Sequence, residues 1–212
     1  ALLLLLAAAA LACGPPDLGS RLEKARSLQD LGDFEASEEV LRDILEQRPE
    51  HPEARYLLGR ALLQTGRAAL AVVPLKGAAE SEEHAEEAGF LLASALYQTS
   101  AFDEAVEALD RVLERAPERN DALLLRARAR LNAGDLEGAI ADSERLLARE
   151  SRSYSALLTK ATALERIDPE RAAEAYVQLE EMASGQGAEI EARACLAHAT
   201  FLQETREDAE AA

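Results

Sequence analysis

Aromatic residues are scarce in this sequence, and tryptophan is absent. Phe, Trp and Tyr make up 4% of the 212 residues, although hydrophobic residues make up 48%. A core of Ala and Leu suits closely approaching helices, because small side chains let helix axes come together and both residues favour helix. The composition therefore predicts an all-α fold with enough apolar surface for a core.

Cysteine and histidine are equally rare. The two cysteines, Cys13 and Cys195, stand near opposite ends of the chain, which argues against a disulfide framework. The three histidines form no pair at metal-ligand spacing, and the chain has no Gly-rich phosphate loop and no Ser-His-Asp or Cys-His arrangement. We therefore predict no metal, no cofactor, no small-molecule substrate and no enzymatic activity.

Basic residues are also in the minority. The chain has 23 Lys and Arg against 40 Asp and Glu, a formal net charge of -17. An acidic surface is repelled by nucleic acid and by anionic lipid headgroups, so the charge argues against nucleic acid as a partner.

The N-terminal segment is the one long apolar run. Residues 1–12 read ALLLLLAAAALA, which as a helix would reach only about 18 Å, short of the roughly 30 Å hydrocarbon core of a bilayer. Its length, its small residues and the break at residues 14–16 match the apolar region of an export signal. Because a basic leader and an initiator Met are missing, we expect the given chain to be truncated at its start.

The stretch LACG at residues 11–14 resembles the lipobox of bacterial lipoproteins. The resemblance implies that Cys13 is lipidated and that residues 13–20 contain the lipidation site and a short tether. Several acyl chains would anchor the protein firmly, on the periplasmic side of a bacterial membrane. The alternative is a simple signal peptide with an incidental cysteine.

Self-similarity at a step of 34 residues is the strongest signal in the chain. Gly32, Gly66 and Gly134 keep this step, with Ser100 in the missing slot. Three more columns follow the same step, and no insertion is expected to disturb them. Their members are Ala25, Gly59, Ala93, Ala127 and Ala161; Ser37, Ala71, Ala105, Ala139 and Ala173; and Leu41, Leu75, Leu109 and Val177, with Ser143 interrupting the last.

The apolar spacing between these columns is helical, as in Leu57, Leu58, Ala61 and Leu62. Each unit is therefore predicted to be two helices, with the glycines at the turn where a left-handed residue is favoured.

This pattern resembles the tetratricopeptide repeat, which places small residues at helix crossings, an aromatic after the turn and a proline at the end. The resemblance implies a right-handed α-solenoid of five helix-turn-helix repeats over residues 18–185. A capping helix over 186–204 and an acidic tail over 205–212 would follow. Cys195 and His198 continue repeat columns, so we expect both to pack in the capping helix. The departures include basic residues where the family usually has leucine, at Lys24, Arg126 and Lys160.

In the family, the first helices of successive repeats line a concave peptide-binding groove. Transferring that geometry gives seven candidate groove residues: Arg26, Tyr56, Arg60, Phe90, Tyr97, Leu124 and Arg128. Arginine and aromatic side chains are enriched at the energetic centres of interfaces, and arginine binds carboxylates through two hydrogen bonds. We expect a peptide ligand with apolar anchors and at least one acid. The alternative is that these apolar residues belong to the core and that the arginines form salt bridges to neighbouring glutamates.

The expected function is that of a non-enzymatic scaffold or adaptor, exported and anchored in a membrane by its lipidated cysteine. The resemblance extends to lipoproteins that assist outer-membrane or pilus-secretion assembly. The alternative is a cytoplasmic or inner-membrane scaffold of the same repeat type with an uncleaved N-terminal anchor.

Overall fold

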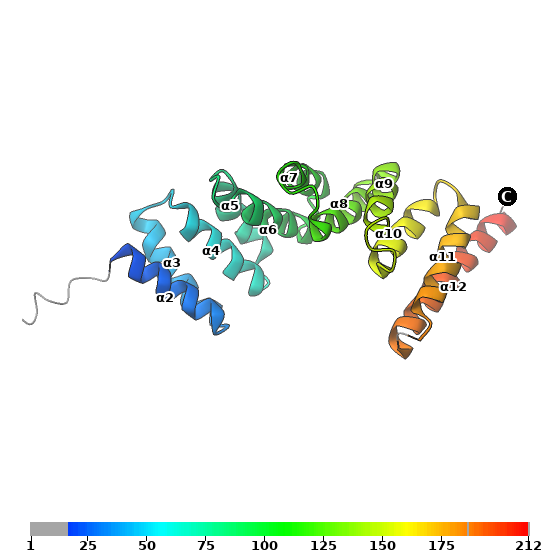
Figure 1. Cartoon of the computed structure of the whole chain (residues 1–212), viewed down its shortest axis with the longest axis horizontal. Helices are drawn as coiled ribbons and strands as arrows, with labels where there is room; N and C mark the ends of the chain where they lie inside the picture. Colours follow the sequence, from blue (N-terminus) through cyan, green and yellow to red (C-terminus); the bar gives the residue numbers. More distant parts are fainter. Residues whose placement is uncertain (1–16, 186, 212) are drawn as a thin grey trace, which may run out of the picture. The chain divides into compact units, whose positions relative to one another are not determined.

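The computed structural model describes residues 17–185 and 187–211, and within these ranges every regular element is an α-helix (Figure 1). The expected signal segment and Cys13 lie outside the described residues. In chain order the helices are α2 (Leu18–Asp30), α3 (Phe34–Gln47), α4 (Pro52–Gln64), α5 (Ala68–Ala79), α6 (Ala85–Gln98), α7 (Phe102–Arg115), α8 (Asn120–Ala133), α9 (Leu136–Leu147), α10 (Tyr154–Leu164), α11 (Pro169–Ala183) and α12 (Ala188–Ala211).

The helices form antiparallel hairpins, as the repeat predicted, so the predicted all-α fold of helix-turn-helix units is confirmed. Helix α2 begins at Leu18, within the segment expected as a tether, and α12 extends beyond residue 204 to Ala211. None of the described helices is both long enough and apolar enough to cross a bilayer.

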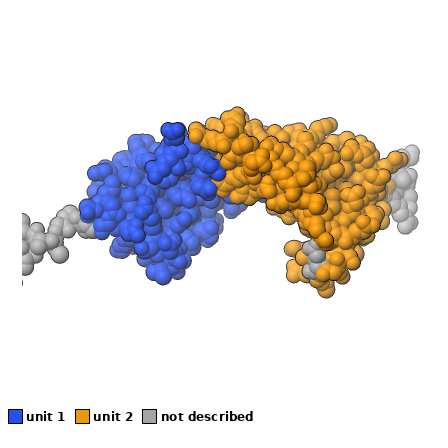
Figure 2. Space-filling view, in the orientation of Figure 1, with its two compact units in different colours: residues 1–99 blue, residues 100–212 orange. Residues whose placement is uncertain are grey.

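The chain divides into two compact units, Ala1–Thr99 and Ser100–Ala212, shown in blue and orange in Figure 2. The first contains α2 to α6, and the second contains α7 to α12. In each unit a second helix packs against the first helix of its own hairpin and against the first helix of the next, as α5 does with α4 and α6.

The turns inside the hairpins explain one repeat column. Gly32, Gly66 and Gly134 have φ angles of 80°, 73° and 88°, and Ser100, which fills the missing slot, has a φ of 61°. These values lie in the left-handed region, which glycine enters without steric cost. The column is therefore selected by backbone conformation.

The small-residue columns mark where the two helices of one hairpin cross. Ala25 has no exposed surface, and its carbonyl accepts a hydrogen bond from the Ser37 hydroxyl of the second helix at 2.9 Å. At the next crossing, a Cβ on Gly59 would lie 2.3 Å from Cγ of Leu75, which is itself fully buried. The helices approach so closely here that only glycine fits.

We expect Gly59→Ala to destabilise the protein by about 1–2 kcal/mol. Alanine favours helix by about 1 kcal/mol over glycine, but overpacking a buried contact costs about 1–3 kcal/mol or more. Gly77→Ala is the matched control, because its Cβ would meet only the end of the Arg55 side chain, which can move. Urea unfolding should show a lower midpoint for the first variant and an equal or higher midpoint for the second. Equal midpoints would contradict this account of the crossing.

The repeat phase breaks in the fifth hairpin, where the prediction of an undisturbed array is wrong. In three earlier turns the backbone N–H of the residue directly before the second helix donates to the carbonyl five residues earlier, as from Asp33 to Leu28. At the fifth turn Asp168 N–H reaches back only four, to Leu164. Helix α11 therefore starts at Pro169, one residue earlier than the 34-residue step requires.

This shorter turn changes which residues are buried. In α11 Ala172 and Tyr176 are buried at the positions next to the predicted Ala173 and Val177, and Val177 is 45% exposed. In α12 Ala194 is buried, and Cys195 is exposed, so the prediction of a buried Cys195 is wrong. In the earlier repeats its column faces the second helix of the same hairpin, and no described helix covers that side of α12.

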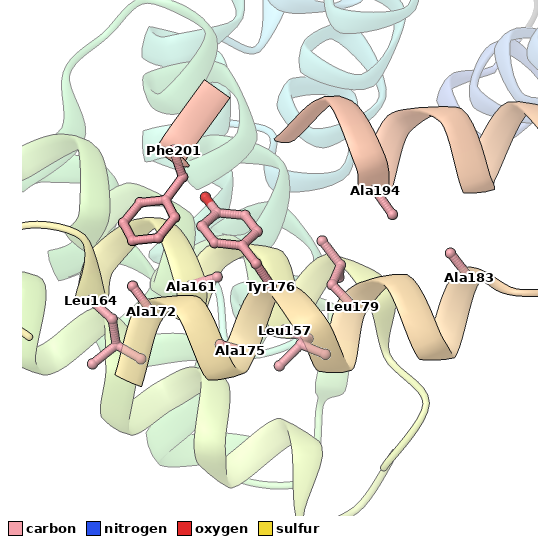
Figure 3. Close-up of a cluster of buried hydrophobic side chains, with 10 residues drawn as sticks. All are labelled: Leu157, Ala161, Leu164, Ala172, Ala175, Tyr176, Leu179, Ala183, Ala194 and Phe201. Atoms are coloured by element: carbon pink, nitrogen blue, oxygen red, sulfur yellow. The ribbon is translucent and has the colours of Figure 1, made fainter. Parts of the chain in front are cut away.

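The last three helices share a compact core, shown in Figure 3. Tyr176 stacks on Phe201 and on His198, with ring centroids 5.3 and 5.8 Å apart. Its hydroxyl donates to Glu165 Oε1 at 2.5 Å. Burial raises the pKa of the Tyr176 hydroxyl and of the Glu165 carboxyl. For Glu165 the hydrogen bond from Tyr176 partly offsets this rise. His198 also lies 3.1 Å from Glu180 Oε1, so its predicted packing role is confirmed.

Candidate functional site

The first unit contains a pocket of about 330 Å³ on the first-helix side of its hairpins. Three of the predicted groove residues line it together: Arg26, Tyr56 and Arg60. Two come from α4 and one from α2, and residues before α6 close the far side. The complete lining is Arg26, Asp30, Glu53, Tyr56, Leu57, Arg60, Glu83 and His84.

An aromatic pair forms one wall of this pocket. The rings of Tyr56 and His84 are nearly parallel, at 4°, with centroids 5.3 Å apart. Both side chains are partly exposed, and Leu57 beside them is buried. The wall offers a flat apolar surface to a ligand side chain. Sequence reasoning missed His84, because it stands alone in a turn without a ligand partner nearby.

Arg26 is already paired with carboxylates of the protein. Its Nε donates to Glu53 Oε1 at 2.7 Å, and a second nitrogen of the guanidinium contacts the same oxygen. Its Nη1 donates to Glu23 Oε2 at 3.0 Å. The hydrogen bond to Glu53 is the largest cause of a raised pKa of Arg26. The alternative interpretation of the arginines, as salt-bridge partners of glutamates, is therefore confirmed for Arg26.

Arg60 is held differently, by a buried amide. Its Nε donates to Gln29 Oε1 at 2.5 Å, and Gln29 is only 4% exposed. The Gln29 amide in turn donates to the Leu57 carbonyl at 2.8 Å and to the Ser37 hydroxyl at 3.1 Å. This network fixes the orientation of Arg60. Its two Nη nitrogens have no hydrogen-bond partner among the described residues, so they can bind a ligand.

Two further carboxylates, those of Asp30 and Glu83, stand at the rim of the pocket and are exposed. Within residues 17–185 and 187–211 neither forms an ion pair. The pocket thus combines one available guanidinium with two available carboxylates, and the Arg26–Glu53 pair contributes little net charge. Its chemistry suits a ligand of mixed charge better than a strongly acidic one.

The other predicted groove residues do not line this pocket. Phe90 and Tyr97 lie on α6 of the same unit and are half-buried. Leu124 and Arg128 lie on α8 of the second unit and are also half-buried. The structure therefore brings together three of the seven predicted residues.

The second unit contains a buried charge cluster that the sequence did not predict. Arg126 donates to both carboxylate oxygens of Asp142, at 2.8 and 2.6 Å, and to Asp110 at 2.6 Å. Arg130 also donates to Asp142, at 2.8 Å. Burial by itself would lower the pKa of Arg126, but the hydrogen bonds and charges of the two aspartates more than offset it, and the pKa is raised.

These contacts explain two departures from the repeat pattern. Arg126 and Lys160 stand where a leucine is usual, and each pairs with an acid sixteen residues earlier or later. Lys160 Nζ lies 2.7 Å from Glu144 Oε1. Because all the groups of the Arg126 cluster are paired with each other, the cluster holds helices together and leaves no free charge for a ligand.

Comparison with known proteins supports the repeat assignment. The sequence profile of the tetratricopeptide repeat matches residues 22–85 and 90–156, which is more than half of the chain. No curated protein matches the sequence significantly.

Several solved structures resemble the fold at low sequence identity. MamA of Desulfovibrio magneticus RS-1, solved from its residue 41 to its end, is 19% identical, with a TM-score of 0.71 over 81% of this chain and 100% of its own. YrrB, described as a TPR protein with an unusual peptide-binding site, is 15% identical, with a TM-score of 0.75 over 84% of this chain and 91% of its own. A repeat protein from Parabacteroides merdae is 20% identical, with a TM-score of 0.72 over 90% of this chain and 74% of its own.

Proposed function

Because the chain belongs to the tetratricopeptide repeat family, we propose that it is a non-enzymatic scaffold that binds a peptide segment of another protein. Such repeats generally bind protein or peptide partners. The observation that carries the proposal is the pocket of the first unit, where Arg60 is oriented by a buried amide beside the Tyr56–His84 wall. A similar structure, YrrB, is described as having a peptide-binding site.

The pocket defines the ligand chemistry. An acidic side chain or terminal carboxylate would accept two hydrogen bonds from the Nη nitrogens of Arg60, the geometry that guanidinium groups favour. An apolar or aromatic side chain next to it would cover the Tyr56–His84 wall. Arg26 contributes less than the sequence suggested, because Glu53 and Glu23 already occupy it. The rim carboxylates Asp30 and Glu83 disfavour an uninterrupted run of acids in the ligand.

Photocrosslinking in cells tests this pocket. A benzophenone amino acid at position 83, on the rim, should capture a discrete partner, which mass spectrometry would identify. The same probe at position 111, exposed on α7, is the control and should not capture it. Arg60→Met, which keeps the aliphatic stem, should abolish the capture at position 83. Because it also leaves Gln29 Oε1 without its donor, capture is measured at a temperature where circular dichroism shows the variant fully folded. Capture that persists in Arg60→Met and in Tyr56→Ala would rule out the pocket as the binding site.

We further propose that the protein is exported and anchored in a membrane through a lipid on Cys13. The support for this proposal is the lipobox-like stretch around Cys13 in the sequence. Palmitate labelling should be lost in Cys13→Ser and kept in Cys195→Ser. A chain that carries no label and retains its N-terminal segment would favour the alternative, an inner-membrane or cytoplasmic scaffold. Outer-membrane and pilus-secretion assembly are the first pathways in which to seek the captured partner.

A further inference from the structure

The pocket of the first unit contains a guanidinium whose charge the protein leaves uncompensated. Arg60 Nε donates to Gln29, which is a neutral amide, whereas Arg26 in the same pocket donates to the carboxylate of Glu53. The Gln29 amide nitrogen donates two hydrogen bonds within the protein, so its orientation is fixed with the oxygen toward Arg60. The positive charge of Arg60 is therefore available to an acid of the ligand.

The same pocket contains a carboxylate in an unfavourable place. Asp30 is exposed and is the last residue of α2. The carbonyl groups at the end of a helix carry partial negative charge, which favours a cation there and disfavours an acid. Helix α2 has no basic residue in its last turn, and no described side chain forms an ion pair with Asp30. A cation of the ligand would therefore be favoured by both the carboxylate and the helix end.

A second carboxylate of this kind comes from the turn before α6. Glu83 is exposed and lies next to His84 of the aromatic wall. The chain contains no Lys or Arg between Lys76 and Arg111. In the part of the chain that the structure describes, Glu83 has no ion-pair partner. This carboxylate too can pair with a cation of the ligand.

The two carboxylates lie on either side of Arg60. Helix α4, which carries Arg60, packs on α2 and on α6, whereas the described parts of α2 and α6 do not pack on each other. A ligand segment that crosses the three helices would therefore pass Asp30, Arg60 and Glu83 in that order. Because two of these three groups are acids and the whole chain has a formal charge of -17, a ligand with net positive charge is attracted to the pocket.

Building on the proposed function, we propose that the bound peptide segment has a central acid, which pairs with Arg60, and a basic residue on each side of it. One basic residue pairs with Asp30. The other pairs with Glu83, beyond the apolar side chain that covers the Tyr56–His84 wall. The two carboxylates thereby determine specificity, because an acid-rich segment would place like charges beside them.

Phage display of random peptides on the full-length protein tests this charge pattern. Peptides selected on the wild type should share a central acid with Lys or Arg on each side. Asp30→Asn and Glu83→Gln, which keep the size of exposed side chains, should each remove the enrichment of Lys and Arg on one side and keep the acid. Glu39→Gln changes an exposed acid on α3 outside the pocket, so this control should select the wild-type pattern.

Fluorescence anisotropy with one selected peptide measures each ion pair. Replacing a basic residue of the peptide with glutamine should weaken binding to the wild type by about two- to fivefold, the range of an exposed ion pair. The same peptide change should have no further effect in the variant that lacks the matching carboxylate, because both changes remove one interaction. Arg60→Met, measured where it is fully folded, should instead remove the preference for the central acid.

The outcomes separate this inference from the proposed function. Peptides that need Arg60 and Tyr56 but show no enrichment of Lys or Arg would overturn the charge pattern and leave the pocket as a peptide site. Unchanged enrichment on Asp30→Asn and Glu83→Gln would have the same meaning. If no selected peptide depended on Arg60 or Tyr56, the pocket would not be the peptide site, and both proposals would be wrong.

Discussion

Ala105→Glu should lower the free energy of unfolding by several kcal/mol, enough to abolish the native fold of the second unit near physiological temperature. Ala105 has no solvent-exposed surface and belongs to the small-residue column of the second helices. A glutamate there is larger than the site allows, and its carboxylate would lose its hydration at a fully buried position. Both costs fall on the folded state alone.

Ala141→Glu provides the matched control. It is the same substitution on another second helix, α9, at an exposed position. Thermal unfolding followed by circular dichroism should show little change for Ala141→Glu and a loss or strong lowering of the transition for Ala105→Glu. If the two variants melted together, the 34-residue register assigned to these helices would be wrong.

Asp142→Ala should destabilise the second unit by about 3–5 kcal/mol, the usual cost of removing one partner of a buried ion pair. The side chain of Asp142 is 5% exposed, and it accepts hydrogen bonds from Arg126 and Arg130. Its removal leaves Arg126, only 12% exposed, with Asp110 as its remaining partner. Asp103→Ala, an exposed acid on α7, is the control and should stay within about 0.5 kcal/mol of wild type.

A double variant separates the charge effect from a packing effect. Combining Asp142→Ala with Arg126→Leu restores the residue that is usual at position 126 in such repeats and removes the unpaired cation. Because an apolar replacement of a buried ion pair is often neutral, the double variant should recover much of the lost stability. Urea unfolding of the four proteins gives the coupling energy. A double variant as unstable as the sum of its parts would show that the cluster does not act as a unit.

Helix pairing was predictable from the sequence because the columns report backbone constraints. The turn glycines have positive φ angles, and Gly59 stands where no Cβ fits. Both constraints select glycine or another small residue, which therefore recurs in the sequence every 34 residues. The fifth hairpin was not predictable in the same way. Its column residues, Ala173 and Val177, are as apolar as their buried neighbours, so composition does not reveal the slip of one residue.

Three residues of the candidate site were predictable from the sequence, but the hydrogen-bond and ion-pair partners of its arginines were not. The spacing places Arg26, Tyr56 and Arg60 on one face, and the structure gathers them in one pocket. Glu23, which pairs with Arg26, lies three residues earlier on the same helix, but the main acid partner of Arg26 and the amide that holds Arg60 each come from a different helix. Glu53 is twenty-seven residues from Arg26, and Gln29 is thirty-one from Arg60. A pattern read along single helices does not register such partners.

The abbreviated turn before α11 limits how far the repeats can be interchanged. One residue corresponds to a rotation of about 100° around a helix axis. Moving a binding residue from α3 or α5 onto α11 by counting in steps of 34 would therefore aim it at a different side of the helix. Engineers who shuffle hairpins of this protein can treat the turns at Gly32, Gly66 and Gly134 as equivalent joints, whereas the joint at Asp168 requires its own numbering.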